Sequence, residues 1–322
     1  MKSLSRLMAG ALLALPLAVI AQGTYPNKPI RMIVPLAAGS AVDNAARVVV
    51  QKMGESMGQG FAVENIAGSS GIIGAERLAR STPDGYTIGG FNDSILTMVP
   101  HMMAKMPWNA LTDFTPVSLV GTIEWGLVVK ADSPHRTLAD FIKAAKAAPG
   151  KLNYGSGGNG SPQHIGMALI ADRGGLDLMH VPYKGATPAA VAVAAGEVDA
   201  SMQGLGTVTS LLQGGKLRLL AVSTRERLPQ YPDVPTFRES GMPDFTFNSW
   251  FAMVAPAGTP PDIVQRLANE ARAAVNDPAT RDKLLAIGVT PLGTTSAELG
   301  ASTKTQFELY RKLIQEKGIS AN

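Results

Sequence analysis

Apolar residues occur in two kinds of pattern along most of the chain. Short continuous apolar runs, typical of buried strands, alternate with longer segments in which apolar residues recur at helical spacing. The strands expected from this pattern span residues 30–35, 61–64, 86–91, 126–129, 152–154, 179–181, 198–202, 217–223 and 247–255. The expected helices span residues 41–58, 72–80, 137–148, 162–173, 188–195, 208–213, 261–275, 281–287 and 296–317. This alternation predicts parallel sheets with helices on both faces.

Two proline-rich stretches, residues 107–116 and 228–243, interrupt the alternation. The order of elements predicts two α/β units of similar size, with the second inserted into the first. We therefore expect two doubly wound α/β domains joined by crossing strands near residues 120–125 and 249–252, with a ligand cleft between them. The expected boundaries are residues 22–122 and 252–322 for domain 1 and residues 123–251 for domain 2.

The first residues resemble a targeting segment. Lys2 and Arg6 precede an uncharged apolar run over residues 7–20, and Val19-Ile20-Ala21 stands before Gln22 as the candidate cleavage site. This arrangement is typical of a secretory signal peptide, so we assign residues 1–21 to one, with cleavage after Ala21. An uncleaved anchor is disfavoured, because the run contains Pro16 and is shorter than the ~20 residues that cross a bilayer. The chain has no cysteine to carry a lipid, so we expect an exported protein that is not a lipoprotein.

Composition narrows the chemistry further. The chain of 322 residues has no cysteine and four histidines, which share no metal-binding spacing, so we expect no metal and no cofactor. The formal net charge is +4, but 27 basic and 25 acidic side chains remain without Lys2 and Arg6. Because the basic residues do not cluster, we expect no nucleic-acid partner.

Three expected strands end in loops rich in Gly and Ser that open a helix, at residues 36–40, 67–71 and 155–161. Backbone N–H groups at a helix start carry a partial positive charge, and small residues let an anion approach them. In open α/β sheets, ligands bind outside the carboxyl ends of the strands, where these loops lie. Ordinary turn chemistry is the alternative interpretation, since many such loops contain Gly.

Two enzyme interpretations of the third loop are disfavoured. Gly155, Gly157 and Gly160 fit a dinucleotide fingerprint, but the acidic residue expected about 20 positions later is missing. Ser161 and His164 stand three positions apart, but no serine-hydrolase motif surrounds them, so we interpret Ser161 as a helix cap or ligand contact. We expect no catalysis, and an exported hydrolase stays a remote alternative.

Segments along nearly the whole chain carry a family resemblance, among them YPNKPIRMIVP (25–35), GIIGA (71–75), PDGYT (83–87), LNYGSGGNG (152–160), HVPYKGATP (180–188) and SWFAMVAPAGTP (249–260). At these segments the chain resembles the substrate-binding proteins of tripartite tricarboxylate transporters, the Bug or TctC family. The resemblance implies a periplasmic, type II periplasmic binding protein-like Venus-flytrap fold that closes on a small carboxylate. It also implies membrane permease subunits as partners, and we expect a monomer.

The same resemblance implies a set of ligand-binding residues. The first loop and the helix start after it contribute Leu36, Gly39, Ser40 and Asp43, the second loop contributes Ser69 and Ser70, and the third loop and its helix start contribute Ser156, Asn159, Ser161 and His164. Tyr183, Gln203 and Trp250 complete the set.

Several alternatives stay open at this point. Tyr183 and Trp250 are equally compatible with core packing, and Gln203 stands where the family often has a Phe-Asp pair. The first loop also lacks an aromatic residue common in the family, so the ligand can differ from those of better-known members. Dicarboxylates, tricarboxylates, amino acids and aromatic acids all fit a carboxylate site lined by N–H groups. A sensor that presents its closed form to a kinase would use the same cleft.

Overall fold

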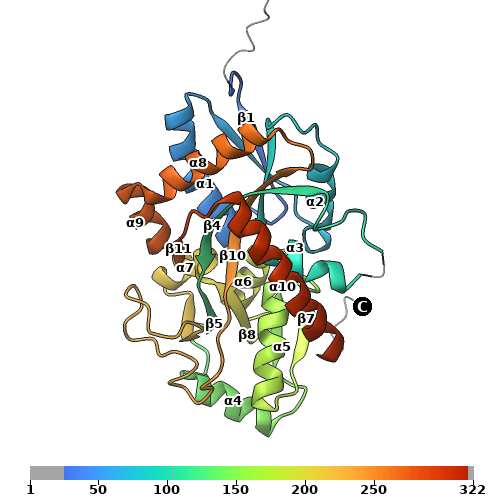
Figure 1. Cartoon of the computed structure of the whole chain (residues 1–322). Coiled ribbons are helices and arrows are strands. Elements are labelled where there is room, and N and C mark those ends of the chain that lie inside the picture. The colour runs from blue at the N-terminus through green and yellow to red at the C-terminus, as the bar shows by residue number, and fades with distance from the viewer. Residues whose placement is uncertain (1–24, 104, 318–322) are drawn as a thin grey trace, which may run out of the picture.

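The computed structural model describes residues 25–103 and 105–317, so the expected signal peptide lies outside the described residues. The chain forms two sheets, one in the upper and one in the lower half of the molecule (Figure 1). The first sheet has the strand order β11-β4-β10-β3-β1-β2 and the second has the order β7-β6-β8-β5-β9. The predicted α/β fold is confirmed.

The first sheet contains β1 (Ile30–Val34), β2 (Phe61–Asn65), β3 (Thr87–Asn92), β4 (Phe114–Ile123), β10 (Ser249–Pro256) and β11 (Val289–Pro291). The second sheet contains β5 (Trp125–Lys130), β6 (Asn153–Ser156), β7 (Met179–Pro182), β8 (Ala200–Gly204) and β9 (Leu217–Val222). In each sheet three strands are parallel, β1 with β2 and β3, and β6 with β7 and β8. The crossing strands β4, β5 and β10 add antiparallel pairs, so both sheets are mixed rather than wholly parallel.

Helices cover both faces of each sheet. Around the first sheet lie α1 (Ala41–Met57), α2 (Ile72–Ala79), α3 (Asp93–Thr97), α8 (Pro261–Asn276), α9 (Pro278–Ala286) and α10 (Ser296–Lys317). Around the second lie α4 (Leu138–Ala147), α5 (Pro162–Gly174), α6 (Ala186–Ala195) and α7 (Leu205–Gln213). The 3-10 turns η1 (Ser69–Gly71) and η2 (Val99–His101) complete the elements. No helix among the described residues is long and apolar enough to cross a bilayer.

Burial explains why these segments adopt these elements. β1 is buried along nearly its whole length, as expected for a central strand between two helical layers. α1 instead buries one face, including Ala45, Val49 and Met53, and ends at Gly58, whose φ of +67° suits a residue without a Cβ. On one face of the first sheet, the buried core includes residues of α1 and α8. On the other face, it includes residues of α2, α3 and α10.

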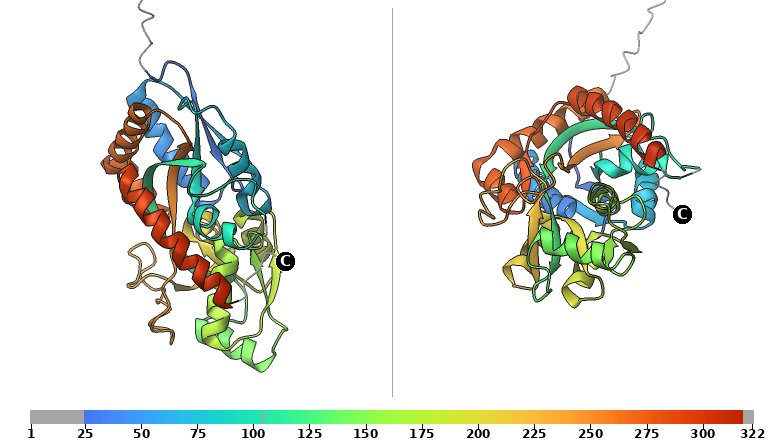
Figure 2. Two further views of the ribbon diagram at one scale, coloured as in Figure 1. Left: turned by 45° about the vertical axis from the view of Figure 1, so that its right-hand side comes forward. Right: turned by 90° about the horizontal axis from the view of Figure 1, so that it is seen from below.

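The two halves lie one above the other, as the left-hand view of Figure 2 shows, and the chain passes directly between them. The chain leaves the first sheet at Ile123 and enters the second at Trp125, with Glu124 between them. The Glu124 carbonyl accepts a hydrogen bond from Leu205 N at 2.8 Å, and Glu124 N donates to Gly288 O at 2.9 Å. The backbone of Glu124 thus contacts both halves of the molecule.

Candidate functional site

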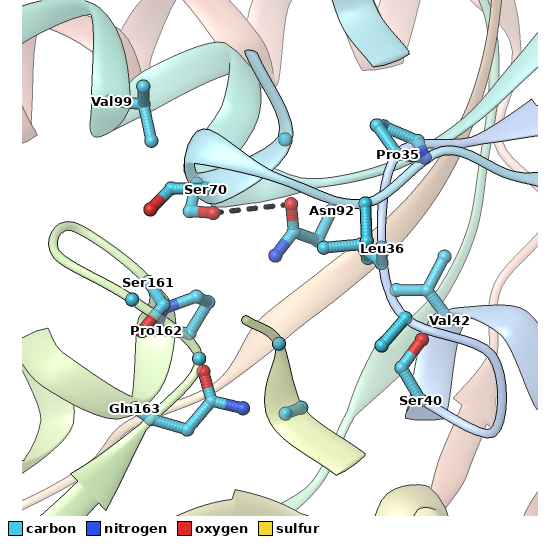
Figure 3. A pocket seen from close by; sticks show the side chains of 18 of the residues that line it. Pro35, Leu36, Ser40, Val42, Ser70, Asn92, Val99, Ser161, Pro162 and Gln163 are labelled. Carbon is cyan, nitrogen blue, oxygen red and sulfur yellow. Dashed lines mark hydrogen bonds between the residues drawn. The ribbon is translucent and has the colours of Figure 1, made fainter. Parts of the chain in front are cut away.

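A cavity of about 350 Å³ lies between the two sheets (Figure 3). Its wall is built from loops that follow the parallel strands β1, β2, β3, β6, β7 and β8, together with residues of the crossing strands. Ligands in open α/β sheets bind at these carboxyl ends. The cavity therefore lies where the sequence predicts the ligand site.

Five helices of eight or more residues begin at this cavity. Their N-cap residues, all of which line it, are Ser40 of α1, Gly71 of α2, Ser161 of α5, Gly185 of α6 and Gly204 of α7. Each helix start contributes roughly half a positive charge through its free N–H groups. Because these starts converge, the cavity attracts anions without a buried arginine.

Formal charge is scarce in the wall. Lys184 is the sole charged side chain among the described residues that line the cavity, and it is exposed. The rest of the wall combines hydroxyl and amide groups with apolar side chains, which include Val42, Val99 and Ile123. The arrangement suits a ligand with an anionic end and an apolar body.

Ser40 and Ser161 have matching roles at the starts of α1 and α5. Each hydroxyl oxygen accepts a hydrogen bond from the backbone N–H three residues later, at 3.3 Å for Ser40 and 3.4 Å for Ser161. Both residues are almost fully buried. Since a hydroxyl that accepts can still donate its own proton, each of them can donate to an anion in the cavity.

The loops of the two halves touch each other beside the cavity. Ser70 Oγ donates to Asn159 O at 2.5 Å, and Thr187 Oγ1 donates to Ala38 O at 2.9 Å. A Cβ placed on Gly185 would lie 2.7 Å from the Cβ of Ala37, closer than two carbon atoms pack. The loops of the two halves are therefore in direct contact beside the cavity.

The predicted ligand-binding residues divide into two groups. Those that line the cavity are Leu36, Ser40, Ser69, Ser70, Asn159, Ser161 and Tyr183. Those outside the wall are Gly39, Asp43, Ser156, His164, Gln203 and Trp250. The members of the second group hold the wall in place or pack in the core, as their hydrogen bonds show.

Asp43 braces the loop between β1 and α1. Its carboxylate is almost fully buried and accepts hydrogen bonds from Gly39 N at 2.8 Å and Asn65 Nδ2 at 2.9 Å. Arg47 forms an ion pair with it at 3.1 Å. These partners satisfy the carboxylate and the Gly39 N–H, and they fix the loop that carries Ser40 into the cavity wall.

Ser156 and His164 brace the third loop in the same way. Gly158 N donates to Ser156 Oγ at 3.1 Å, and Gly160 N donates to His164 Nδ1 at 3.1 Å. The His164 ring stacks on His180 with centroids 4.1 Å apart, and His180 Nε2 lies 2.6 Å from Ser156 Oγ. Burial lowers the pKa of His164, and burial with the adjacent His164 lowers the pKa of His180 to about 4.

These contacts argue against a catalytic pair in which His164 would act as the base for a Ser161 nucleophile. The Ser161 hydroxyl contacts the backbone N–H of His164 rather than the imidazole ring. The ring nitrogen Nδ1 accepts from Gly160 N, so it does not activate Ser161. The pair is a helix cap and a loop brace.

Gln203 and Trp250 lie behind the wall. Gln203 is fully buried, donates to Ser201 Oγ at 2.9 Å, and accepts from Gln163 Nε2 at 3.4 Å. Trp250 packs in the core of the first sheet and donates to Gln306 Oε1 at 2.8 Å. Because side chains alternate along a strand, the neighbour of Trp250, Ser249, faces the cavity instead.

Several wall residues were not predicted. They include Asn92, Ser94, Trp125, Gln163 and Ser249. Trp125 donates from Nε1 to Ser249 Oγ at 2.9 Å, so one crossing strand fixes the other at the cavity. Gln163 is the second residue of the helix that Ser161 caps, a position that the sequence pattern could have indicated.

The second loop has an unusual backbone. Ser69 and Ser70 have φ angles of +46° and +53°, a region that residues other than Gly seldom occupy. Such conformations persist where the surrounding structure enforces them, and they cluster at ligand sites. This turn places Ser70 against the third loop.

Comparison with known proteins agrees with this geometry. Residues 45–319 match the family described as the tripartite tricarboxylate transporter family receptor, TctC. A relative from Pseudomonas sp. strain P51, the UPF0065 protein in the tcbD-tcbE intergenic region, is 38% identical over 299 residues. The match covers 92% of this chain and 89% of the relative.

Solved structures extend the comparison. Periplasmic binding protein BugD is 30% identical with a TM-score of 0.87, over 92% of this chain and 99% of that one. An R. palustris protein solved with adipate is 31% identical with a TM-score of 0.89, over the same shares. MatC from Rhodopseudomonas palustris, solved with bound malate, is 27% identical with a TM-score of 0.84, over 90% of this chain and all of that one. Since the family match spans most of its length, the chain belongs to the TctC family of tripartite tricarboxylate transporter receptors.

Proposed function

We propose that this protein is an exported, periplasmic solute-binding protein that captures a small carboxylate by closure of two domains. The observation that carries the proposal is the convergence of five helix starts on one cavity whose described wall contains no acidic side chain. Two structural relatives, solved with adipate and malate, support the carboxylate class.

The energetics of this site are sufficient for capture. A hydrogen bond to a charged group contributes about 1.5–3 kcal/mol, and micromolar affinity corresponds to about 8 kcal/mol. The hydroxyls of Ser40 and Ser161 and a few N–H groups at the helix starts can supply this free energy, after the cost of ordering the ligand. Binding requires no turnover, so we assign no catalytic residue.

Closure would take place at the crossing strands. We propose residues 22–122 and 252–322 as domain 1 and residues 123–251 as domain 2. Ligand bonded to both Ser40 and Ser161 would bridge the domains and stabilise the closed form, in which Ser70 contacts Asn159. The closed monomer would then deliver its ligand to the permease subunits of a tripartite transporter.

The first test is a thermal-shift screen of the chain from Gln22 onward, with carboxylates and their uncharged amides. Ligand at about 100 times Kd adds about 2.7 kcal/mol of stability, so an acid that binds should raise Tm where its amide does not. Ser161→Ala should weaken binding of that acid about 10- to 150-fold, because a hydrogen bond to a charged group is lost.

Ser210→Ala is the matched control, since Ser210 is exposed on α7 and lies outside the cavity wall. The control should bind the acid with wild-type affinity. If acids and amides shift Tm equally, or if both serine variants bind like the wild type, the anion site proposed at the helix starts is wrong.

A further inference from the structure

Asp93 is a buried carboxyl group that lies directly behind the cavity wall. It is the first residue of α3 and is 1% exposed, and neither of its carboxyl oxygens has a hydrogen-bond partner among the described residues. Its neighbours in the chain, Asn92 and Ser94, both line the cavity, and Figure 3 shows the Asn92 side chain there. Because consecutive Cα atoms are ~3.8 Å apart, the Asp93 carboxyl group lies within about 10 Å of the wall.

The described elements that pack against α3 place no positive charge beside Asp93. These elements are β3, β10, η2 and α10. β3 and β10 carry no titratable side chain, η2 carries His101, and the α10 residue that interacts electrostatically with Asp93 is Tyr310. The charged residues Glu308 and Arg311 of α10 interact with His101 instead. An isolated buried carboxylate is costly, so Asp93 holds a proton, and burial raises its pKa to about 8.

A proton on Asp93 keeps negative charge away from the cavity. Lys184 is the sole charged side chain among the described residues of the wall. Ionisation of Asp93 would place a negative charge about 10 Å from a bound anion, in a buried region that salt screens poorly. At an effective dielectric constant near ~20, two such charges change an affinity by roughly an order of magnitude. The anion and the Asp93 proton therefore favour each other's binding.

We propose that capture of an anionic ligand is coupled to protonation of Asp93. The ligand binds the protein whose Asp93 is neutral, and its binding draws a proton onto Asp93 where the free protein is partly ionised. This inference rests on the proposed function, because it requires an anion in the cavity, and it goes beyond that function by linking ligand release to pH. The affinity is constant at lower pH and falls as the pH rises through the range in which Asp93 loses its proton.

The first test is calorimetric titration between pH 7 and pH 9.5 with adipate, with malate, and with any other acid that raises Tm in the thermal-shift screen. Each Kd is compared with the value that the same protein has at pH 7. The Kd of wild-type protein should rise at least about 5-fold over this range. The Kd of Asp93→Asn, which cannot ionise at this position, should stay within about twofold of its value at pH 7.

The matched control is Asp282→Asn, a change on the exposed surface of α9 outside the cavity wall. It removes a carboxylate that the cavity does not sense, so its Kd should rise with pH as that of wild-type protein does. Asp93→Leu has a similar shape and no charge, and it replaces Asp93→Asn if that variant does not fold.

Proton uptake is the second test, and it can be made on wild-type protein alone. At pH 8 each ligand that binds should draw up to about half a proton from the buffer. The heat of binding should therefore differ between phosphate and Tris, two buffers that release different heats on ionisation. The Asp93→Asn protein should give equal heats in the two buffers.

The outcomes separate this inference from the proposed function. If wild-type protein binds a carboxylate with a Kd that does not change with pH and with equal heats in both buffers, the coupling is refuted while the carboxylate site stands. The same conclusion follows if both Asp93 variants keep the wild-type pH dependence. If no carboxylate binds wild-type protein at pH 7, the proposed function fails, and the coupling fails with it.

Discussion

At the scale of single residues, Asp93 stands out as a buried carboxyl group without a hydrogen-bond partner. It is 1% exposed, and neither oxygen has a partner in the part of the chain that the structure describes. Burial raises the pKa of Asp93 to about 8. The nearby backbone N–H groups of Ser94 and Trp250 lower this pKa in part, although neither is close enough to form a hydrogen bond. Tyr310 on α10 is the titratable group that interacts with it. Asp93 is therefore mostly protonated in the folded protein at neutral pH.

This environment predicts a pH dependence of stability. Because the pKa rises from 3.8 in the unfolded chain to about 8 on folding, the folded state holds the extra proton between these values. The stabilising contribution is complete below about pH 4 and is lost as pH rises toward 8, by up to about 1.4 kcal/mol per pH unit.

Asp93→Asn removes this titration and keeps the shape of the side chain. Thermal unfolding of both proteins across this pH range should show the Tm of the variant rising relative to wild type as pH increases. Parallel Tm curves for the two proteins would contradict the assignment of a protonated Asp93.

The type of a residue and its place in the sequence did not suffice to predict whether its side chain lines the cavity. The sequence offers Trp250 in a family-like segment, but the face on which it lies depends on how β10 pairs, and that pairing directs Ser249 inward. Asp43 and His164 lie at helix starts beside Ser40 and Ser161, yet their side chains turn back to hold the loops. The directions of these side chains depend on strand pairing and on specific hydrogen bonds, which cannot be predicted from the local sequence pattern.

At the scale of elements, the loop between β1 and α1 depends on the Asp43 carboxylate. Asp43→Asn keeps the volume but removes the charge that pairs with Arg47, leaving an amide that cannot accept all of the present hydrogen bonds. We expect the free energy of unfolding to fall by about 1–3 kcal/mol, measured by urea denaturation.

The control for this change is Asp282→Asn on the exposed surface of α9, which should alter stability by less than about 0.5 kcal/mol. Carboxylate affinity of the Asp43 variant should also fall, because Gly39 and its loop lose their anchor. Equal stability of the two variants would show that Asp43 does not brace the loop.

Most elements were predictable, because their periodicity extends over enough residues. The helices α1, α5 and α8 and the strands β1, β3 and β9 occur where the sequence predicts them. β4 was not predicted, because it begins inside a proline-rich stretch. Pro116 is tolerated in this strand because it lies at a register shift opposite β10, where the missing backbone N–H costs little. α3 and β11 are too short to show a period. Since α3 was missed, Asn92 and Ser94 were missed as wall residues.

At the scale of the whole molecule, the proposed capture depends on closure of the two halves. Gly185 has a φ of +128° and lies directly against Ala37 across the cleft. Gly185→Ala would introduce both backbone strain and a clash at this contact. Carboxylate affinity should drop at least about 10-fold, since part of the binding free energy is spent on a strained closed form.

Gly215→Ala is the matched control, because Gly215 also has positive φ but has open space around it. Calorimetric titration with the same acid should show near wild-type affinity for this control. A Gly185 variant that binds as tightly as the Gly215 variant would mean that capture does not require the contact between the first loop and α6.

The central claim is that a carboxylate, held by helix starts from both halves, closes the molecule. Small-angle X-ray scattering tests it most directly, with the protein alone, with the carboxylate that binds most tightly, and with the matched amide. The radius of gyration should fall when the carboxylate is added, and scattering with the amide should equal that of the protein without ligand. A carboxylate that binds but leaves the scattering unchanged, or an amide that compacts the protein equally, would contradict it.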